Sequence, residues 1–181
     1  TTSRTSGLAD MVKKPIAAGN LFIGQFDPTN ALQDAMSATK FGRAFSFESK
    51  PKTLSGYYKY QAGEKFTDKN MNVLEQKDYG TIYAVFYDNH DQAGNAVVLY
   101  GDNVQTSPQV VALARLDNID NTPEWTPFTL NFIYRKDIDA QKLKNGGYSI
   151  AIVCSSSTNG AEFMGAVGST LWVDKFKITC E

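Results

Sequence analysis

The stretch G168-S-T-L-W-V-D-K-F-K-I-T-C180 changes the side on which its apolar residues fall, and this decides how the last strand packs. Before Asp174 the apolar residues are at odd positions, Leu171 and Val173. After it they are at even positions, Phe176, Ile178 and Cys180. Successive side chains of a strand point to opposite faces, so strict alternation would bury Asp174 and would require a cation or hydrogen-bond donors around it. A β-bulge at Asp174 keeps both apolar sets on the core and turns the carboxylate aside, and we expect this arrangement.

Length and composition limit the fold and the partners. A chain of 181 residues is long enough for one well-buried core and too short for two comfortable domains, so we expect one domain. The formal net charge of −1 provides no basic field for a phosphate backbone, and we expect no nucleic-acid partner. No apolar run approaches the ~20 residues of a membrane span. No signal-peptide pattern opens the chain, so we expect it to be cytosolic or already trimmed.

Short apolar runs separated by turn residues dominate the sequence. The run T81-I-Y-A-V-F-Y87 is apolar on both faces, and F128-T-L-N-F-I-Y134 has its large apolar residues on one side. We expect both to be central strands, with further strands at 95–100, 109–114 and 148–154.

The connections are rich in residues that accept tight turns, and only 31–40 has a helical pattern, with Leu32 and Met36 four apart. Many evenly spaced strands with long connections favour an all-β fold. We therefore expect an antiparallel β-sandwich of jelly-roll type with one short helix.

Motifs for catalysis are scarce. His90 is the only histidine in the sequence, so neither a histidine-based triad nor a multi-histidine metal site can be assembled. Cys154 and Cys180 permit one disulfide without implying it, and we expect buried free thiols. Glycoside hydrolysis would need two acids that converge across a cleft. The acids available for such a pair are Glu48, Glu64, Glu75, Asp88, Asp91, Glu124 and Asp174.

The aromatic residues are more informative. Tyr57, Tyr58 and Tyr60 lie close together, and in a strand Tyr58 and Tyr60 share one face while Tyr57 takes the other. A tyrosine can pack its ring and keep its hydroxyl in water, which suits both a half-exposed sheet face and a sugar-stacking platform. Trp125 stands between two prolines, where an indole is either a lid over the core or an exposed ligand contact.

Five motifs from about residue 15 to the end occur in a familiar order; they are A17-A-G-N-L-F-I-G24, F41-G-R-A-F45, K50-P-K-T-L-S-G-Y-Y-K-Y-Q-A-G63, D78-Y-G-T-I-Y-A-V-F-Y87 and S155-S-S-T-N-G-A-E-F-M-G-A-V-G-S-T-L-W-V-D174. This succession resembles the family described as "Putative carbohydrate metabolism domain", which is found in Bacteroidetes surface proteins. The resemblance implies a jelly-roll β-sandwich like that of many carbohydrate-binding modules. It also implies an extracellular or cell-surface location, at the C-terminal end of secreted or lipid-anchored proteins.

The N-terminus departs from the family pattern. The family has further strands before 17–24, and T1-T-S-R-T-S6 resembles the end of one of them. We therefore expect residues 1–15 to form an N-terminal segment that ends a truncated strand, and residues 16–181 to form a single β-sandwich domain. Missing strands would leave an open sheet edge or require another domain or chain to fill it.

The metal site implied by the resemblance is also altered. Related modules hold a structural calcium ion with an acid on the last strand, at the place that Asp174 occupies. The family has a second acid directly after it, where this chain has Lys175. The resemblance implies a structural calcium ion at Asp174, whereas the lysine in place of the second acid argues against it; no other cofactor is expected.

Together these features predict a non-catalytic carbohydrate-binding module of a bacterial surface or secreted protein, with a polysaccharide or glycan as its partner. The expected ligand-binding residues are Tyr57, Tyr58, Tyr60 and Trp125 for stacking, with Arg43 and Glu124 for hydrogen bonds to sugar hydroxyls. The main alternative is a structural or adhesive domain in which all the aromatic residues belong to the core. A glycoside hydrolase, which requires two carboxyl groups roughly 5 to 9.5 Å apart, is the third hypothesis. An exposed aromatic row on one sheet face would favour sugar binding.

Overall fold

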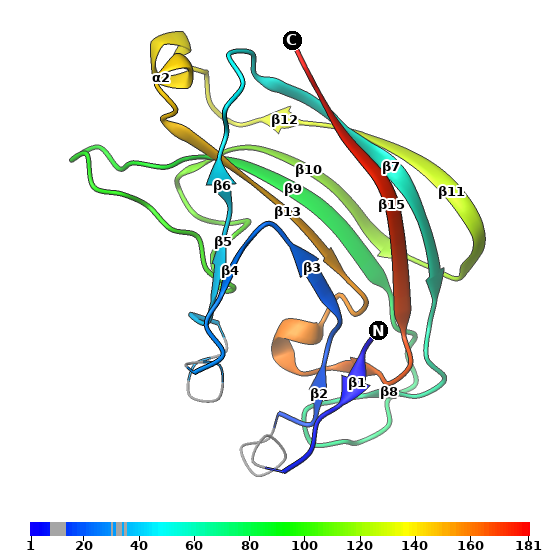
Figure 1. The fold of residues 1–181 in the computed structure, drawn as a ribbon. Coiled ribbons are helices and arrows are strands. Elements are labelled where there is room, and N and C mark those ends of the chain that lie inside the picture. The colour runs from blue at the N-terminus through cyan, green and yellow to red at the C-terminus, as the bar shows by residue number, and fades with distance from the viewer. Residues whose placement is uncertain (8–13, 30, 32–33, 35) are drawn as a thin grey trace.

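The computed structural model describes residues 1–7, 14–29, 31, 34 and 36–181, and its strands form two antiparallel layers around a shared core (Figure 1). One layer has the strand order β12-β10-β9-β13-β3, with β6 also paired to β13. Its strands are β3 (Asn20–Phe22), β6 (Arg43–Ala44), β9 (Gly80–Asp88), β10 (Val110–Ile119), β12 (Ile133–Tyr134) and β13 (Tyr148–Ser155). The other layer has the order β11-β7-β15, formed by β7 (Pro51–Gln61), β11 (Thr122–Asn131) and β15 (Thr170–Cys180).

Smaller elements surround these layers. Three two-stranded pairs are β1 (Ser3–Arg4) with β2 (Ile16–Ala17), β4 (Gly24–Phe26) with β5 (Thr39–Phe41), and β8 (Phe66–Thr67) with β14 (Gly165–Ala166). Among the described residues the helical elements are α2 (Ala140–Lys144) and the 3-10 turn η1 (Gly160–Glu162). The expected all-β antiparallel sandwich is confirmed, whereas its jelly-roll connectivity stays a prediction.

The predicted helix at 31–40 is wrong at its C-terminal end, because Thr39 and Lys40 belong to β5. Positions 32, 33 and 35 of that prediction lie outside the described residues.

Strand β9 forms the centre of the larger sheet and is buried on both faces, as its sequence predicts. Ile82, Ala84 and Phe86 face the core between the two layers. The odd-numbered residues from Tyr83 to Tyr87 pack instead into a second apolar cluster on the outer side of this sheet. That second cluster is covered by the chain around Leu99 and Val104 and by Phe22 and Phe41, so a third, irregular layer lies over the sheet.

Two strand predictions need correction. The segment 128–134 is not one central strand, because β11 ends at Asn131 on the edge of the smaller sheet and β12 pairs with β10 in the other sheet. The chain crosses between the layers at Phe132, which is itself buried in the core. The segment 95–100 makes only isolated bridges, so its apolar residues serve as a cover over the sheet.

The bulge predicted in the last strand is confirmed. The register of β15 against β7 shifts between Asp174 and Lys177, and Lys175 adopts a left-handed backbone conformation with φ of 54°. As a result the apolar residues on both sides of the bulge pack against the same core, while Asp174 remains exposed. Phe176 then lies over Gly56 of the neighbouring strand, where an added Cβ would come 2.5 Å from its ring.

A buried polar cluster, here called the Asp78 network, joins segments that are distant in sequence. Asp78 is 1% exposed, and its Oδ2 accepts hydrogen bonds from Ser157 Oγ (2.6 Å), Ser169 Oγ (2.7 Å) and the Ala166 amide (2.7 Å). Its Oδ1 accepts from the Tyr79 amide at 3.0 Å. The network also includes Thr2 and Ser156, whose hydroxyls lie 2.7 Å apart, and Thr2 lies 2.5 Å from Ser157 Oγ. Several donors stabilise a buried carboxylate without any cation.

Two further predictions concern the thiols and membrane spans. Cys154 and Cys180 are free, as predicted, but only Cys154 is buried, whereas Cys180 is half-buried. Burial raises the pKa of the Cys154 thiol to about 12. Among the described residues no helix is both long and apolar enough to cross a membrane.

Substitutions at the bulge test its backbone conformation. Lys175→Gly should change the free energy of unfolding by less than about 0.5 kcal/mol, because relief of the left-handed conformation offsets the extra freedom of the unfolded chain. Lys175→Val should lower the free energy of unfolding by about 1–2 kcal/mol, because a β-branched residue tolerates positive φ poorly. Urea denaturation measures both. Lys177 is the matched control because its backbone is extended, so valine should be tolerated there and glycine should destabilise the protein. If the glycine variant were less stable than the valine variant at both positions, the bulge at Lys175 would be contradicted.

Removal of the Asp78 carboxylate should destabilise the whole domain. Asp78→Ala leaves three buried donors without an acceptor, so we expect the free energy of unfolding to fall by about 3 kcal/mol or more. Asp78→Asn keeps one acceptor oxygen, so its free energy of unfolding should fall less. Thermal and urea unfolding provide the measurement. The exposed Asp137 is the control, and its replacement by alanine should stay within about 0.5 kcal/mol of wild type. An Asp78→Ala protein as stable as this control would show that the network is not needed.

Candidate functional site

The outer face of the smaller sheet carries exposed aromatic residues. Along β7 the even positions from Leu54 to Tyr60 turn toward the core, so Tyr57 and Lys59 point outward. The register of β15 places Trp172 directly beside Lys59 and Asp174 beside Tyr57. The two strands therefore present an indole, an ammonium group and a phenol side by side.

Trp125 joins this group from the other edge strand through a second irregularity. The pairing of β11 with β7 runs from Thr122 opposite Tyr60 to Thr126 opposite Tyr58, so residues 123–125 all lie opposite Lys59. The extra residues bend the strand and turn Trp125 outward. We call Tyr57, Lys59, Trp125 and Trp172 the aromatic face.

The aromatic face is exposed and held in place by cation–π contacts. Trp125 is 47% exposed, and Trp172 and Tyr57 are each 41% exposed. The Lys59 ammonium lies 5.2 Å from the ring centroid of Trp125 and 5.5 Å from that of Trp172. The indoles stand on strands two apart in the sheet, which separates them by roughly 9.6 Å. A short oligosaccharide can bridge such a distance.

The structure separates the other predicted tyrosines from this face. Tyr60 is 1% exposed and donates its hydroxyl hydrogen bond to the Ser156 carbonyl at 3.0 Å, and burial raises its pKa. Tyr58 is half-buried and packs against Phe128 in the core. Both turn inward because they pair with the core-facing residues Leu171 and Val173. Both side chains therefore pack in the core and do not join the aromatic face.

The remaining predicted site residues fall in different places. Glu124 is exposed in the β11 irregularity directly before Trp125. Arg43 is exposed on β6, in the other sheet, and does not join the aromatic face. Asp174 is exposed, and its carboxylate accepts from the Lys175 amide at 2.8 Å. No group of three or more His, Cys, Asp or Glu side chains that could hold a metal occurs in the part of the chain that the structure describes.

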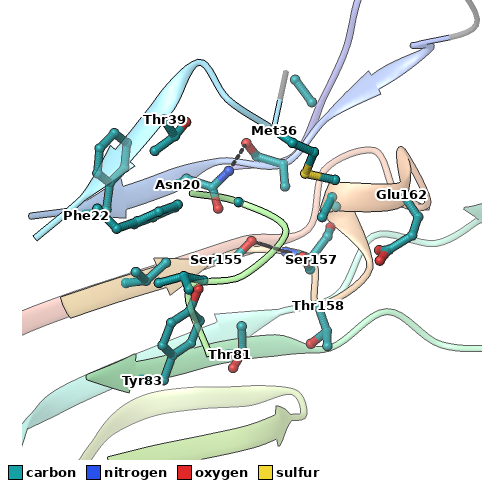
Figure 2. Close-up of a pocket in the computed structure, with 18 of the residues that line it drawn as sticks. Asn20, Phe22, Met36, Thr39, Thr81, Tyr83, Ser155, Ser157, Thr158 and Glu162 are labelled. Atoms are coloured by element: carbon teal, nitrogen blue, oxygen red, sulfur yellow. Dashed lines mark hydrogen bonds between the residues drawn. The ribbon is translucent and has the colours of Figure 1, made fainter. Parts of the chain in front are cut away.

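A separate pocket of about 650 Å³ opens on the outer side of the larger sheet. Figure 2 shows Thr81 and Tyr83 of β9, Ser155 of β13 and Phe22 of β3 around one hollow, with Glu162 at its rim. Hydroxyl groups and aromatic rings are mixed in its wall, a composition that suits a small polar molecule with an apolar face.

The electrostatics of this pocket centre on one ion pair. Arg115 Nη2 donates to Asp117 Oδ1 at 2.8 Å and Nε to Oδ2 at 2.7 Å, so the guanidinium holds the carboxylate in a two-pronged contact. Thr81 also donates to Asp117 Oδ1 at 3.3 Å. Burial raises the pKa of Tyr83 to about 12, so its hydroxyl stays protonated at neutral pH. The pocket thus combines a fixed carboxylate, a neutral phenol and the exposed carboxylate of Glu162.

Sequence reasoning missed Trp172 and the pocket. A signal for Trp172 was present, because a bulge at Asp174 with Leu171 and Val173 on the core necessarily turns Trp172 outward. The pocket had no comparable signal, since its wall is assembled from separate segments between Ile16 and Phe163.

Comparisons with known proteins identify the family. The family described as "Putative carbohydrate metabolism domain" matches residues 1–179, and the chain belongs to it. The comparison with curated proteins found no match.

Two solved structures share this fold closely. One is titled a putative glycoside hydrolase from Bacteroides thetaiotaomicron, with a TM-score of 0.91 and 43% identity over 99% of this chain and 52% of its own. The other is titled a putative glycoside hydrolase from Bacteroides vulgatus, with a TM-score of 0.88 and 44% identity over 99% of this chain and 71% of its own. The chain thus spans about half the length of the first protein.

Proposed function

We propose that this domain is a non-catalytic glycan-binding module of a bacterial surface or secreted protein, and that the aromatic face is its binding site. The observation that carries the proposal is the pair of exposed indoles, Trp125 and Trp172, turned to the same side of the sheet with Lys59 between them. The family's connection with carbohydrates supports this proposal.

The physical basis of binding is stacking. One face of a pyranose ring carries C–H groups that pack on an indole or phenol, while its hydroxyl groups reach polar neighbours at the rim. Glu124 and Asp174 lie next to the aromatic residues and can accept hydrogen bonds from such hydroxyls. An open sheet surface suits the interior of an extended chain, which can enter and leave from either side.

The structural or adhesive alternative is less well supported. It requires the aromatic residues to belong to the core, and Tyr57, Trp125 and Trp172 are substantially exposed. Large exposed aromatic groups on one sheet face are typical of an interaction surface.

A glycoside hydrolase is the second candidate, favoured by two observations. Both similar structures are described as putative glycoside hydrolases, and the pocket contains the carboxylates of Asp117 and Glu162. The bidentate contact with Arg115 holds the Asp117 carboxylate in one orientation, which suits a nucleophile or base, and Glu162 would then be the acid. The similar proteins are longer than this chain, so their activity would also depend on segments beyond the shared domain.

Binding should depend on both indoles. On a panel of plant, host and microbial polysaccharides, we expect Trp125→Ala and Trp172→Ala each to weaken binding by about tenfold, or about 1.4 kcal/mol, because each removes a stacking surface. The double variant should not bind. Phe47→Ala removes an exposed ring elsewhere and should bind as wild type does. Circular dichroism confirms folding, and a folded double variant with full affinity would disprove the proposed site.

A reducing-sugar assay on the glycans that bind separates the two candidates. We expect no release of reducing ends by the wild-type domain, because the pocket that contains Asp117 and Glu162 lies over the larger sheet, whereas the aromatic face belongs to the smaller one. If hydrolysis does occur, Asp117→Asn and Glu162→Gln in the pocket should each abolish it, while Trp172→Ala should leave turnover of a small soluble substrate unchanged. That pattern would establish the hydrolase and overturn the non-catalytic reading.

A further inference from the structure

Three lysines lie in or beside the aromatic face, and none of them forms an ion pair with a described residue. Lys59 lies between the two indoles, and the Lys175 ammonium lies 5.9 Å from the ring centroid of Tyr57. Lys177 pairs with Ser55, which shares the outward side of β7 with Tyr57 and Lys59. Within the described part of the chain, none of these three lysines has a carboxylate within 4.0 Å; the salt bridges found there use other cations.

The acids near this face do not neutralise the lysines. Asp174 lies next to Tyr57, but its carboxylate is directed to the backbone amide of Lys175. Glu124 is the other acid beside the face. The charge here is therefore locally positive, on a chain whose formal net charge is −1.

From this arrangement we propose that the ligand of the aromatic face is an acidic polysaccharide whose sugars carry carboxylates, that is, one rich in uronic acids. This inference rests on the proposed glycan-binding function. Two sugars stacked on Trp125 and Trp172 bring the link between them over Lys59, where a carboxylate on either sugar meets the ammonium group. Lys175 and Lys177 extend the same positive track along β15, so a polymer with regularly spaced carboxylates makes repeated contacts.

The energetics favour an anion over a neutral sugar. A hydrogen bond to a charged group is stronger than a neutral one, and the Lys59 ammonium is already partly removed from water by the rings on either side. A neutral sugar that covers Lys59 would bury this charge without a partner, which is unfavourable. The same face could stack nucleotide bases, but three lysines beside two acids on a net-negative chain are a poor match for a continuous phosphate backbone.

The test compares polygalacturonate with the same polymer after chemical reduction of its carboxyl groups, by calorimetry or affinity electrophoresis. We expect wild type to bind the acidic form about tenfold more tightly at about 0.1 M salt, and to lose this preference near about 1 M, where screening is nearly complete. Lys59→Met keeps much of the aliphatic stem and removes the charge, so it should reduce affinity for polygalacturonate about tenfold and flatten the salt dependence. Lys69→Met, in the exposed loop after β8, is the matched control and should behave as wild type.

The outcomes separate the two proposals. Equal, tryptophan-dependent binding of the acidic and reduced polymers would overturn the acidic ligand and leave the glycan-binding function intact. No binding to either polymer or to any glycan in the panel would overturn both. Tighter binding of dextran sulfate or of a thymidine oligonucleotide than of polygalacturonate would also overturn the assignment to uronic acids.

Discussion

The buried carboxylate of Asp78 is the interaction on which the rest of the fold depends. Its partners come from the segment directly after β13, from β14 and from the turn that leads into β15, at separations of 79, 88 and 91 residues along the chain. Because every donor is a hydroxyl or an amide, the charge is stabilised only when all these segments are in place together. Glycine is required at position 165, where a side chain would come 2.7 Å from Ser157 Oγ. The network therefore fixes where the last strand begins.

The position of β15 in turn determines the aromatic face. Ser169 is held by Asp78, and the next residue, Thr170, starts the pairing of β15 with β7. Once this register is set, alternation places Trp172 next to Lys59, and the bulge at Lys175 returns the following apolar residues to the core. The backbone geometry of the aromatic face follows from strand register, from the irregularity at residues 123–125 of β11 and from the bulge at Lys175 of β15.

Sequence reasoning succeeded where a local pattern carried the information. The shift of apolar residues from odd to even positions around Asp174 predicted the bulge, and the run 81–87, apolar on both faces, predicted the central strand. Both signals lie within one segment. It failed where the outcome depended on distant partners. The alternation of Tyr57 and Tyr58 was evident, but their inward or outward direction depends on pairing with β15, more than a hundred residues later. The role of Asp78 was invisible for the same reason.

The motifs shared with the family specify the core of the fold and leave part of the exposed surface free to vary. The quoted motifs that include Asp78, Ser157 and Ser169 converge on the network, so the resemblance carries the fold itself. Trp125 lies outside those motifs, on an exposed irregularity of an edge strand, where a different side chain could stand without disturbing the core. Relatives with the same network can therefore differ in the surface they present, and a shared fold does not require a shared glycan. If the proposed function holds, the specificity of this chain resides in the charges and rings of its aromatic face, that is, in two indoles with a lysine between them.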